Sequence, residues 1–212
     1  MLSMANEPGE RSPRGPLSGI RVLALEQMQA LPFATQLLAR LGADVVKIES
    51  PGGELGRASQ PSMPDPEGRT LGATFLRNNL GKRSVCVDLK DPRGRQLVLD
   101  MAPHFDVVAE NFRAGTMARL GLAFDDVAAA HSRCVYVSVS GFGSVTDSPY
   151  RDRPAFAPIV EAMSGIYEMK REGDRPPTVS PVGALGDIGA ALFAAVGILA
   201  ALRERDRSGA AQ

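Results

Sequence analysis

The sequence predicts an α/β fold built on a doubly wound, mainly parallel sheet. Three observations predict it. Short, continuous apolar runs recur along the chain, segments of helical pattern separate them, and the connecting stretches are rich in Gly and Pro. Strands that are buried on both faces read as unbroken apolar runs, and strands that alternate with helices form parallel sheets. With 212 residues, 44% of them hydrophobic, the chain is long enough for one sizeable domain.

The first strand, helix and second strand are expected early in the chain. Residues 20–25 (IRVLAL) form an apolar run that predicts a buried strand. A helix is expected over residues 32–41, because a proline suits its first turn and a glycine follows its end. A second strand follows at residues 44–48 (DVVKI). Residues 50–72 are dense in Gly and Pro, which predicts a long loop that is functional or mobile.

The same alternation continues to the end of the chain. Strands are expected at residues 85–89 (VCVDL), 106–109 (DVVA) and 134–139 (CVYVSV). Helices are expected near residues 92–101, 116–120, 125–130 and 156–163, and a last helix is expected to begin at Asp187. Ligands of doubly wound sheets bind beyond the carboxyl ends of the strands. The loops at residues 26–31, 49–57, 110–112 and 140–144 should therefore surround one crevice.

Asp187 is the most informative residue of the chain. It lies within Gly183–Gly189 (GALGDIG), and residues 188–202 after it carry no charge, so the acid should lie at the rim of a buried region. One interpretation is a helix N-cap, in which the carboxylate accepts a hydrogen bond worth about 0.5–2 kcal/mol. The other is a nucleophile, since the positive end of a helix favours the ionised form and glycines let a bulky ligand approach. The two roles can coexist, because a carboxylate has two oxygens.

Composition argues against several classes of function. The 24 Lys and Arg residues balance 24 Asp and Glu residues, so nothing suggests a nucleic-acid partner. Cys86 and Cys134 fall in strand-like apolar runs and are expected to be buried thiols of a reducing compartment. His104 and His131 are expected at helix ends. No spacing among these residues suits a metal site.

No targeting segment and no membrane span are expected. Residues 1–15 are polar and rich in Pro and Gly, which predicts a disordered tail without the apolar core of a signal peptide. The longest apolar stretch, residues 188–202, is shorter than the roughly 18 residues of a membrane span. We therefore expect a cytoplasmic protein with no membrane partner.

A nicotinamide dehydrogenase is the competing interpretation of such a sheet. Glu49, at the end of the second predicted strand, is where an acid that binds a ribose would lie. However, the first turn, residues 26–32, contains no glycine, so the GxGxxG cradle for a pyrophosphate is absent. This argues against a dinucleotide ligand.

Several segments, in order along the chain, resemble one family, the class III CoA-transferases of the CaiB/BaiF type. This family includes formyl-CoA transferase and carnitine CoA-transferase. The segments are residues 16–27 (PLSGIRVLALEQ), 32–53 (PFATQLLARLGADVVKIESPGG), 78–95 (NNLGKRSVCVDLKDPRGR), 106–122 (DVVAENFRAGTMARLGL), 135–143 (VYVSVSGFG) and 186–209 (GDIGAALFAAVGILAALRERDRSG). Together they cover essentially everything after the predicted tail, and their order and spacing make the resemblance specific.

The resemblance implies a reaction for Asp187. In that family the matching aspartate attacks an acyl-CoA thioester to give a mixed anhydride. The CoA thiolate returns to form an aspartyl-CoA thioester, and an acceptor acid then takes the CoA. A carboxylate needs positioning and removal of water to act as a nucleophile, and the glycine-rich, apolar setting of Asp187 is suited to both. A CoA thioester is then a substrate, and no tightly bound cofactor is expected.

Other site residues are implied by the same resemblance. Gln29 matches a glutamine beside the reacting carboxylate in formyl-CoA transferase, with a simple turn amide as the alternative. Lys82 and Arg83 match basic residues near the phosphates or adenine of CoA, although adjacent cations before a strand are also commonly solvated. The positions expected to line the CoA channel are Asn111, Phe112, Arg119 and Ser140, and core packing is the alternative for Phe112.

The acids that are exchanged remain open. The loops at residues 54–69 and 168–177 are expected to shape the acyl pocket. Arg57, Arg69 and Arg151 could each anchor an acceptor carboxylate, with a solvated loop charge as the alternative for each.

Two departures from the family narrow the prediction. The family's racemase branch uses a histidine in the stretch matching residues 153–165, where this chain has Phe156, so racemisation lacks one acid/base and is disfavoured. Family members are also longer, with a second half that forms a smaller domain, completes the first and allows interlocked dimers. Residues 16–212 are therefore expected to be the N-terminal part of a large, Rossmann-like CoA-binding domain. A homodimer or a companion subunit would supply the rest, and the alternative is a CoA-binding half-protein that is inactive alone.

Overall fold

The computed structural model describes residues 15–143, 147–179 and 183–212. All of the predicted disordered tail except Gly15 lies outside these described residues. Within them, the chain folds around a five-stranded sheet with the order β5-β2-β1-β6-β7, in which every pairing is parallel. The strands are β1 (Arg21–Leu25), β2 (Asp44–Glu49), β5 (Arg83–Cys86), β6 (Val107–Glu110) and β7 (Val135–Ser138). The predicted doubly wound α/β sheet is confirmed.

The strand order places a switch point next to the central strand. From β1 the chain adds β2 and β5 on one side, and it then crosses over to add β6 and β7 on the other. The loops after β1 and β6 consequently lead away in opposite directions and leave a crevice between them. Ligands of open α/β sheets bind in such a crevice, so this topology fixes where the functional site is to be sought.

Two helical layers cover the sheet because residues of the buried strands alternate between its faces. Val22 and Ala24 of β1 pack with α1 (Ala30–Arg40) and α7 (Leu185–Ser208), while Leu23 and Leu25 pack in the opposite core. That second core includes side chains of α3 (Pro92–Met101), α4 (Thr116–Leu120) and α5 (Phe124–Ala130). The predicted helix positions agree with these bounds to within one or two residues, and α7 begins two residues before the predicted start at Asp187.

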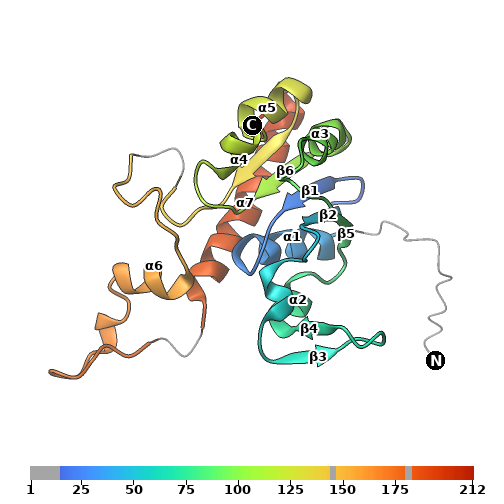
Figure 1. Ribbon diagram of the computed structural model, residues 1–212. Helices are drawn as coiled ribbons and strands as arrows, with labels where there is room; N and C mark the ends of the chain where they lie inside the picture. The colour runs from blue at the N-terminus through green and yellow to red at the C-terminus, as the bar shows by residue number, and fades with distance from the viewer. Residues whose placement is uncertain (1–14, 144–146, 180–182) are drawn as a thin grey trace, which may run out of the picture.

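The segment between β2 and β5 contains structure that its composition did not predict. Residues 50–72 hold the 3₁₀ turn η1 (Leu55–Ala58) and a hairpin of β3 (Ser62–Pro64) and β4 (Thr70–Gly72), and α2 (Ala73–Asn78) follows directly. Figure 1 shows this hairpin at the lower end of the molecule, next to α2. A short 3₁₀ turn, η2 (Ala102–His104), follows α3.

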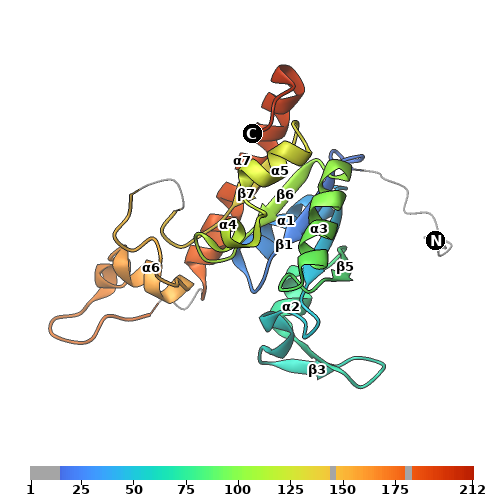
Figure 2. The ribbon, with the colours of Figure 1, turned by 45° about the horizontal axis from the view of Figure 1, so that its top comes forward.

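A second group of elements lies apart from the sheet. It consists of α6 (Ala157–Met163) and the 3₁₀ turn η3 (Glu168–Lys170), and its long loops connect β7 to α7. In Figures 1 and 2 this group projects to one side of the molecule, and α7 joins it to the rest.

Helix α7 differs from the sequence-based expectation in length. It has 24 residues, and by length and composition alone it could cross a membrane. The prediction of no membrane span rested on residues 188–202, the shorter apolar stretch inside this helix. In the structure α7 packs one face on α1 and the sheet, with Ala191, Ile198 and Leu202 buried in that core. Only 17% of its most apolar window is buried, because the opposite face of the helix is exposed in the described residues.

The prediction for the two cysteines is half right. Cys134, beside β7, is buried, and burial raises the pKa of its thiol to about 11. Cys86 is exposed, so the prediction of a buried thiol was wrong there. The reason is that β5 spans residues 83–86, two residues earlier than predicted, and is an edge strand with every residue exposed.

Candidate active site

A cavity of about 500 Å³ lies at the carboxyl ends of β1, β6 and β7. The loops after these strands contribute residues 27–30, 111–114 and 139–141 to its lining. The opposite side comes from the segment before α6 and from the first turn of α7, including Asp187. The cavity therefore occupies the crevice that the doubly wound topology predicts. Of the loop predicted at residues 49–57, Leu55 is the one lining residue within the described ranges.

Five of the predicted site residues meet in this cavity. Asp187, Gln29, Asn111, Phe112 and Ser140 all line it, although they come from four separate parts of the chain. Ser140 also carries a buried hydroxyl oxygen that has no hydrogen-bond partner in the described ranges. The structure thus brings together the predicted nucleophile, the predicted amide beside it and three of the residues predicted to hold CoA.

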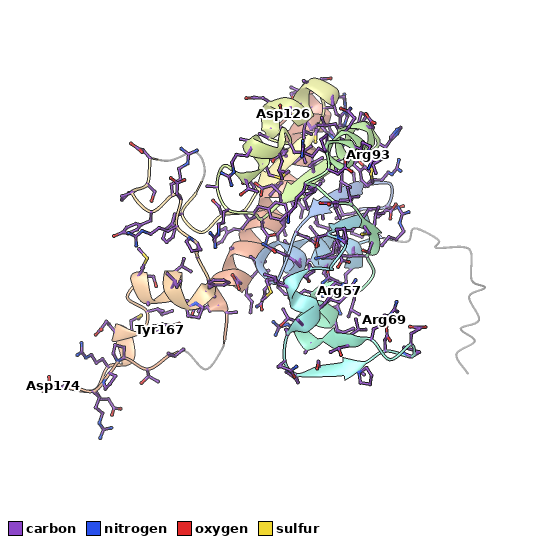
Figure 3. The ribbon with its side chains drawn as sticks, viewed as in Figure 1. Arg57, Arg69, Arg93, Asp126, Tyr167 and Asp174 are labelled. Carbon is purple, nitrogen blue, oxygen red and sulfur yellow. The ribbon has the colours of Figure 1, made fainter. Side chains whose placement is uncertain are left out.

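Asp187 does not cap its helix, so that interpretation of the sequence was wrong. Helix α7 begins at Leu185 after Ala184, which places Asp187 third in the first turn. The capping acceptor is Glu161 of α6, whose Oε1 receives the Gly186 N–H at 2.8 Å. Tyr167 donates its hydroxyl proton to the other oxygen of Glu161 at 2.6 Å. Figure 3 shows Tyr167 on the projecting segment that follows α6.

The Asp187 carboxyl is consequently left available to the cavity. Within residues 15–143, 147–179 and 183–212, no hydrogen bond is made to its oxygens. Burial raises the pKa of this carboxyl above its usual range, and the negative charge of Glu161 raises it further. The helix end was expected to favour the ionised form, but the loss of water outweighs it. Once ionised, such a poorly solvated carboxylate is well prepared for nucleophilic attack.

Gln29 is oriented by an arginine. It stands at the N-cap position of α1 but makes no capping hydrogen bond with its side chain. The Arg77 guanidinium donates to Gln29 Oε1 at 2.6 Å. Because a guanidinium can only donate, the amide oxygen must face Arg77. The amide NH₂ of this cavity residue has no partner in the described part of the chain and can donate to a ligand.

The Asn111 amide ties together the two loops at the switch point. Its Oδ1 accepts the Gln27 N–H at 2.9 Å, and its Nδ2 donates to the Gln27 carbonyl, also at 2.9 Å. Asn111 was predicted to hydrogen-bond CoA, but the structure shows its side chain joining the loops after β1 and β6. One N–H of the amide is still free for a ligand.

Met28 adopts a conformation that the sequence did not reveal. Its φ is 62°, in the left-handed region that disfavours residues with a β-carbon, at a cost of about 1–3 kcal/mol. Its N–H donates to Glu54 Oε2 at 2.9 Å, and its carbonyl accepts from Asn78 Nδ2 at 3.2 Å. The one hint in the sequence is that the loop at residues 26–32 contains no glycine to take up such a turn.

Lys82 is buried in an ion-pair network and is not at the cavity. Its ammonium donates to Glu26 Oε1 at 2.6 Å, to the Pro32 carbonyl at 2.8 Å and to Asn79 Oδ1 at 3.0 Å. Burial is the main cause that lowers the pKa of Lys82, to about 8. Each ammonium proton therefore has a protein acceptor, which leaves none for a phosphate. The alternative of a solvated lysine is also wrong.

Arg83 and Arg119, also predicted to contact CoA, lie on the surface outside the cavity lining. Arg83 pairs with Asp44 of the neighbouring strand, with Nε donating to Oδ1 at 3.0 Å. Arg119 donates to Thr116 Oγ1 at 3.0 Å within α4. The structure thus does not bring the basic residues that the resemblance implied to the cavity.

Of the three arginines predicted as acid anchors, Arg151 lines the cavity. Arg57 is taken up by a bidentate pair with Glu49, at 2.6 and 2.8 Å, and lies over the Phe75 ring. Arg69 is paired with Asp65 and Glu67. Figure 3 shows Arg57 near α2 and Arg69 on the β3–β4 hairpin, on the opposite side of the molecule from α6.

Sequence reasoning missed two further cavity cations, Arg113 and Arg153. With Arg151 they give the cavity three guanidinium groups, none of which forms an ion pair with a carboxylate in the described ranges. The arginine-rich RDRP run at residues 151–154 was the available signal. The same ranges contain no group of three or more His, Cys, Asp or Glu side chains placed to hold a metal ion.

Comparison with known proteins agrees with this fold. The sequence matches the CoA-transferase family III over residues 17–212. It is 43% identical over 208 residues to succinyl-CoA–D-citramalate CoA-transferase of Chloroflexus aurantiacus, covering 96% of this chain and 49% of that protein. It is 40% identical to succinyl-CoA:mesaconate CoA-transferase of Haloarcula hispanica, covering 93% of this chain and 50% of that protein.

A solved structure shows the same architecture. A CaiB/BaiF family protein from Brucella suis superposes with a TM-score of 0.87 at 36% identity, over 93% of this chain and 52% of that chain. The sheet, the helical layers and the sequence match define one class, the α/β proteins of the CaiB/BaiF type. The chain belongs to the CoA-transferase family III, and it spans about half the length of the curated relatives it matches.

Proposed function

We propose that this chain carries the nucleophilic part of a CoA-transferase site, in which Asp187 takes the acyl group from one CoA thioester so that CoA can pass to another acid. The observation that supports this best is the state of Asp187. Its carboxyl lines the cavity, it has no hydrogen bond in the described ranges, and its capping duty is performed by Glu161. A carboxylate with a purely structural role would be expected to have such partners.

In the proposed reaction, a carboxylate oxygen of Asp187 attacks the thioester carbonyl carbon, and the C–S bond breaks to release CoA thiolate. The thiolate then attacks the Asp187 carbonyl of the mixed anhydride and displaces the donor acid as its carboxylate. The acceptor carboxylate attacks the resulting aspartyl thioester, and a second thiolate attack on the new anhydride yields the acceptor's CoA thioester and free Asp187. No net proton is gained or lost over the cycle.

The cavity supplies groups suited to these steps. The free NH₂ of Gln29 can donate to the oxyanion that forms on the attacked carbonyl. Three arginines without carboxylate partners make the cavity attractive to anions, either the phosphates of CoA or the carboxylate of an acid. The two relatives are named for transfer from succinyl-CoA to organic acids. We propose acids of that general class as substrates here.

We further propose that a second copy or a companion chain completes the site. Helix α7 presents a row of apolar side chains to solvent, and Phe193, the most exposed of them, is 81% accessible. The other members of the row are Leu192, Val196 and Leu199. An exposed patch of this kind is typical of a surface that another polypeptide covers.

Trapping the covalent intermediate tests the function. The chain is incubated with succinyl-CoA, alone and with a C-terminal companion chain, and treated with hydroxylamine or borohydride before peptide mass spectrometry. We expect a hydroxamate or an alcohol at Asp187, and none in the isosteric Asp187→Asn variant. Absence of label in every mixture would contradict the proposal. Calorimetric binding of CoA in that case would favour the alternative of a CoA-binding half-protein.

A further inference from the structure

The loop after β1 is held at four consecutive residues by side chains from other parts of the chain. Glu26 is bound by Lys82 and by the Thr35 hydroxyl. Gln27 is bound by Asn111, Met28 by Glu54 and Asn78, and Gln29 by Arg77. The loop connects strand β1 to helix α1, and such short connections form without a side-chain hydrogen bond at every residue. The contact at Met28 bears most directly on the position of the cavity residue Gln29, which follows it in the chain.

Glu54 binds the part of this loop whose backbone conformation is least favourable, the peptide of Met28. The same carboxylate oxygen, Oε2, accepts the N–H of Met28 at 2.9 Å and the N–H of Gly56 at 2.8 Å. Met28 is the residue with positive φ, and it directly precedes Gln29. Without an acceptor for its N–H, the Met28 peptide would relax toward a conformation that suits a residue with a β-carbon. The direction in which Gln29 leaves the loop would change with it.

Glu54 is more deeply buried, and closer to another buried charge, than the capping of a short 3₁₀ turn requires. Glu54 is the N-cap of η1, but its side chain is only 4% exposed, and the capped turn has four residues. Lys47 Nζ, itself 1% exposed, lies 3.7 Å from the other carboxylate oxygen and 3.7 Å from Glu26. A buried carboxylate is costly unless it is compensated, so a charge pair placed under the loop points to a further role for Glu54.

We propose that Glu54 is a positioning residue for the CoA-transfer reaction: its carboxylate holds the Met28 peptide in the left-handed conformation and so fixes where Gln29 stands in the cavity shared with Asp187. The inference rests on the proposed function for its consequence in catalysis. The effect of Glu54 on the loop conformation does not depend on that function and has its own measurement.

The first measurement is amide hydrogen exchange of the peptide that covers residues 26–30. Glu54→Ala removes both acceptor oxygens, and we expect these amides to exchange at least about 10-fold faster than in the wild type. Glu67→Ala is the matched control, because Glu67 lies in the same segment but is exposed and pairs with Arg69. We expect exchange in that variant to equal the wild type. Unchanged exchange in Glu54→Ala would overturn the proposal.

The second measurement is the rate of Asp187 acylation in a single turnover, with the KM for the acyl-CoA recorded beside it. A displacement of about 1 Å in a catalytic group can cost about 100-fold in rate. We expect a loss of that order for Glu54→Ala with KM nearly unchanged, and no loss for Glu67→Ala. An acylation rate within about 3-fold of the wild type in folded Glu54→Ala would overturn the proposal.

A rescue separates positioning from general destabilisation. Glycine occupies positive φ without strain. Met28→Gly therefore lets the loop keep the same backbone conformation without the hydrogen bond to Glu54. We expect Glu54→Ala/Met28→Gly to recover at least about 10-fold of the lost rate, measured well below the melting temperature of each variant. Rates that do not recover would contradict positioning through Met28.

Two outcomes need their own readout. Should Glu54→Ala fail to fold, Glu54→Gln keeps the shape and one acceptor oxygen, and the same exchange and rate measurements apply with a smaller expected effect. Should the wild type form no adduct at Asp187 under any condition, the proposed function fails. Hydrogen exchange then still decides whether Glu54 holds the loop.

Discussion

The two walls of the cavity are built in different ways. The inner wall, residues 27–29 with Asn111, lies at the carboxyl ends of β1 and β6, and each residue of the loop 26–29 is held by a side chain from elsewhere. The outer wall, residues 151–157, ends at the first residue of α6 and lies on the group of elements that projects from the sheet (Figures 1 and 2). Phe156 of the outer wall is 61% exposed.

This difference separates a part of the cavity that the described chain holds by its own contacts from a part that it leaves exposed. The inner wall has its buried charges paired and its loop fixed before any ligand arrives. The outer wall and the adjoining face of α7 expose apolar side chains that nothing in the described chain covers. We therefore expect changes under the inner wall to affect folding strongly, and changes on the exposed face to act mainly on association.

Removing the buried cation beneath the inner wall should have the largest effect. In Lys82→Met the Glu26 carboxylate, fully buried, loses its 2.6 Å partner, and breaking a buried pair in this way costs about 3–5 kcal/mol. Arg83→Met is the matched control, since the adjacent Arg83 pairs with Asp44 on the surface, where a pair contributes about 0–1 kcal/mol. Urea denaturation of both variants measures the difference, and equal losses would contradict a strong contribution of the buried Lys82–Glu26 pair beneath the inner wall.

The same lysine gives the stability a distinct pH dependence. Its pKa is about 8 in the folded chain against 10.5 for an ordinary lysine, mainly because of burial. Between these values the unfolded chain binds more protons than the native one, so the contribution of Lys82 to the free energy of unfolding rises with pH. Wild type should therefore gain stability relative to Lys82→Met between about pH 8 and 10 in urea titrations. A relative loss over that range would show that the ammonium is not desolvated.

The next largest effect should distinguish the two faces of α7. Ile198 is fully buried against the sheet, and truncation to Ala should cost about 2–5 kcal/mol. Phe193 lies on the exposed face, and its replacement by Ala should change the free energy of unfolding by no more than about 0.5 kcal/mol. Phe193→Ala should instead weaken binding to a second copy or a companion chain in sedimentation measurements. A loss of stability as large as that of Ile198→Ala would mean that this face is already covered in the chain as purified.

The smallest effect should come from the charge of Glu161 in α6, which acts on the pKa of Asp187. Burial and then the negative charge of Glu161 raise the pKa of Asp187. Asp187 attacks as the carboxylate, so the acylation rate should fall as pH drops through this raised pKa. Glu161→Gln removes the charge, and the acid limb of the pH–rate profile should move to lower pH. Asp174→Asn, on the same projecting segment (Figure 3), should leave the limb in place.

Glu161→Gln has a structural cost that must be measured beside the profile. Its two oxygens accept from Gly186 and Tyr167, and an amide can keep only one of these bonds. The melting temperature therefore accompanies each pH–rate profile. A limb that stays fixed or moves to higher pH would contradict a charge interaction between Glu161 and Asp187.

The course of the chain follows from sequence patterns, because apolar period and turn residues are local properties. The runs at residues 20–25 and 44–48 predicted β1 and β2 almost to the residue. The run at 85–89 was placed two residues late, since an edge strand buries little and leaves a weak pattern. The β3–β4 hairpin was missed because Gly and Pro in residues 50–72 read as loop.

The site was predictable where residue type limits the role and not where partners decide it. Asp187 stood out because a lone acid opens an apolar helix, but its cap, Glu161, is 26 residues earlier in the sequence and comes from another helix. Lys82 has the same side chain whether it meets a phosphate or a buried carboxylate. Only the fold places Glu26 within 2.6 Å of it. The left-handed Met28 likewise depends on Glu54, which no local pattern connects to it.

The fixed loop also bears on how such a site could diversify. A replacement at any one of residues 26–29 disturbs a contact with a distant element, so it would need a second, matching change to be tolerated. Residues 151–157 make few such contacts with distant elements. New acid preferences should therefore arise by single substitutions in the outer wall, while the arrangement around Asp187 is inherited intact.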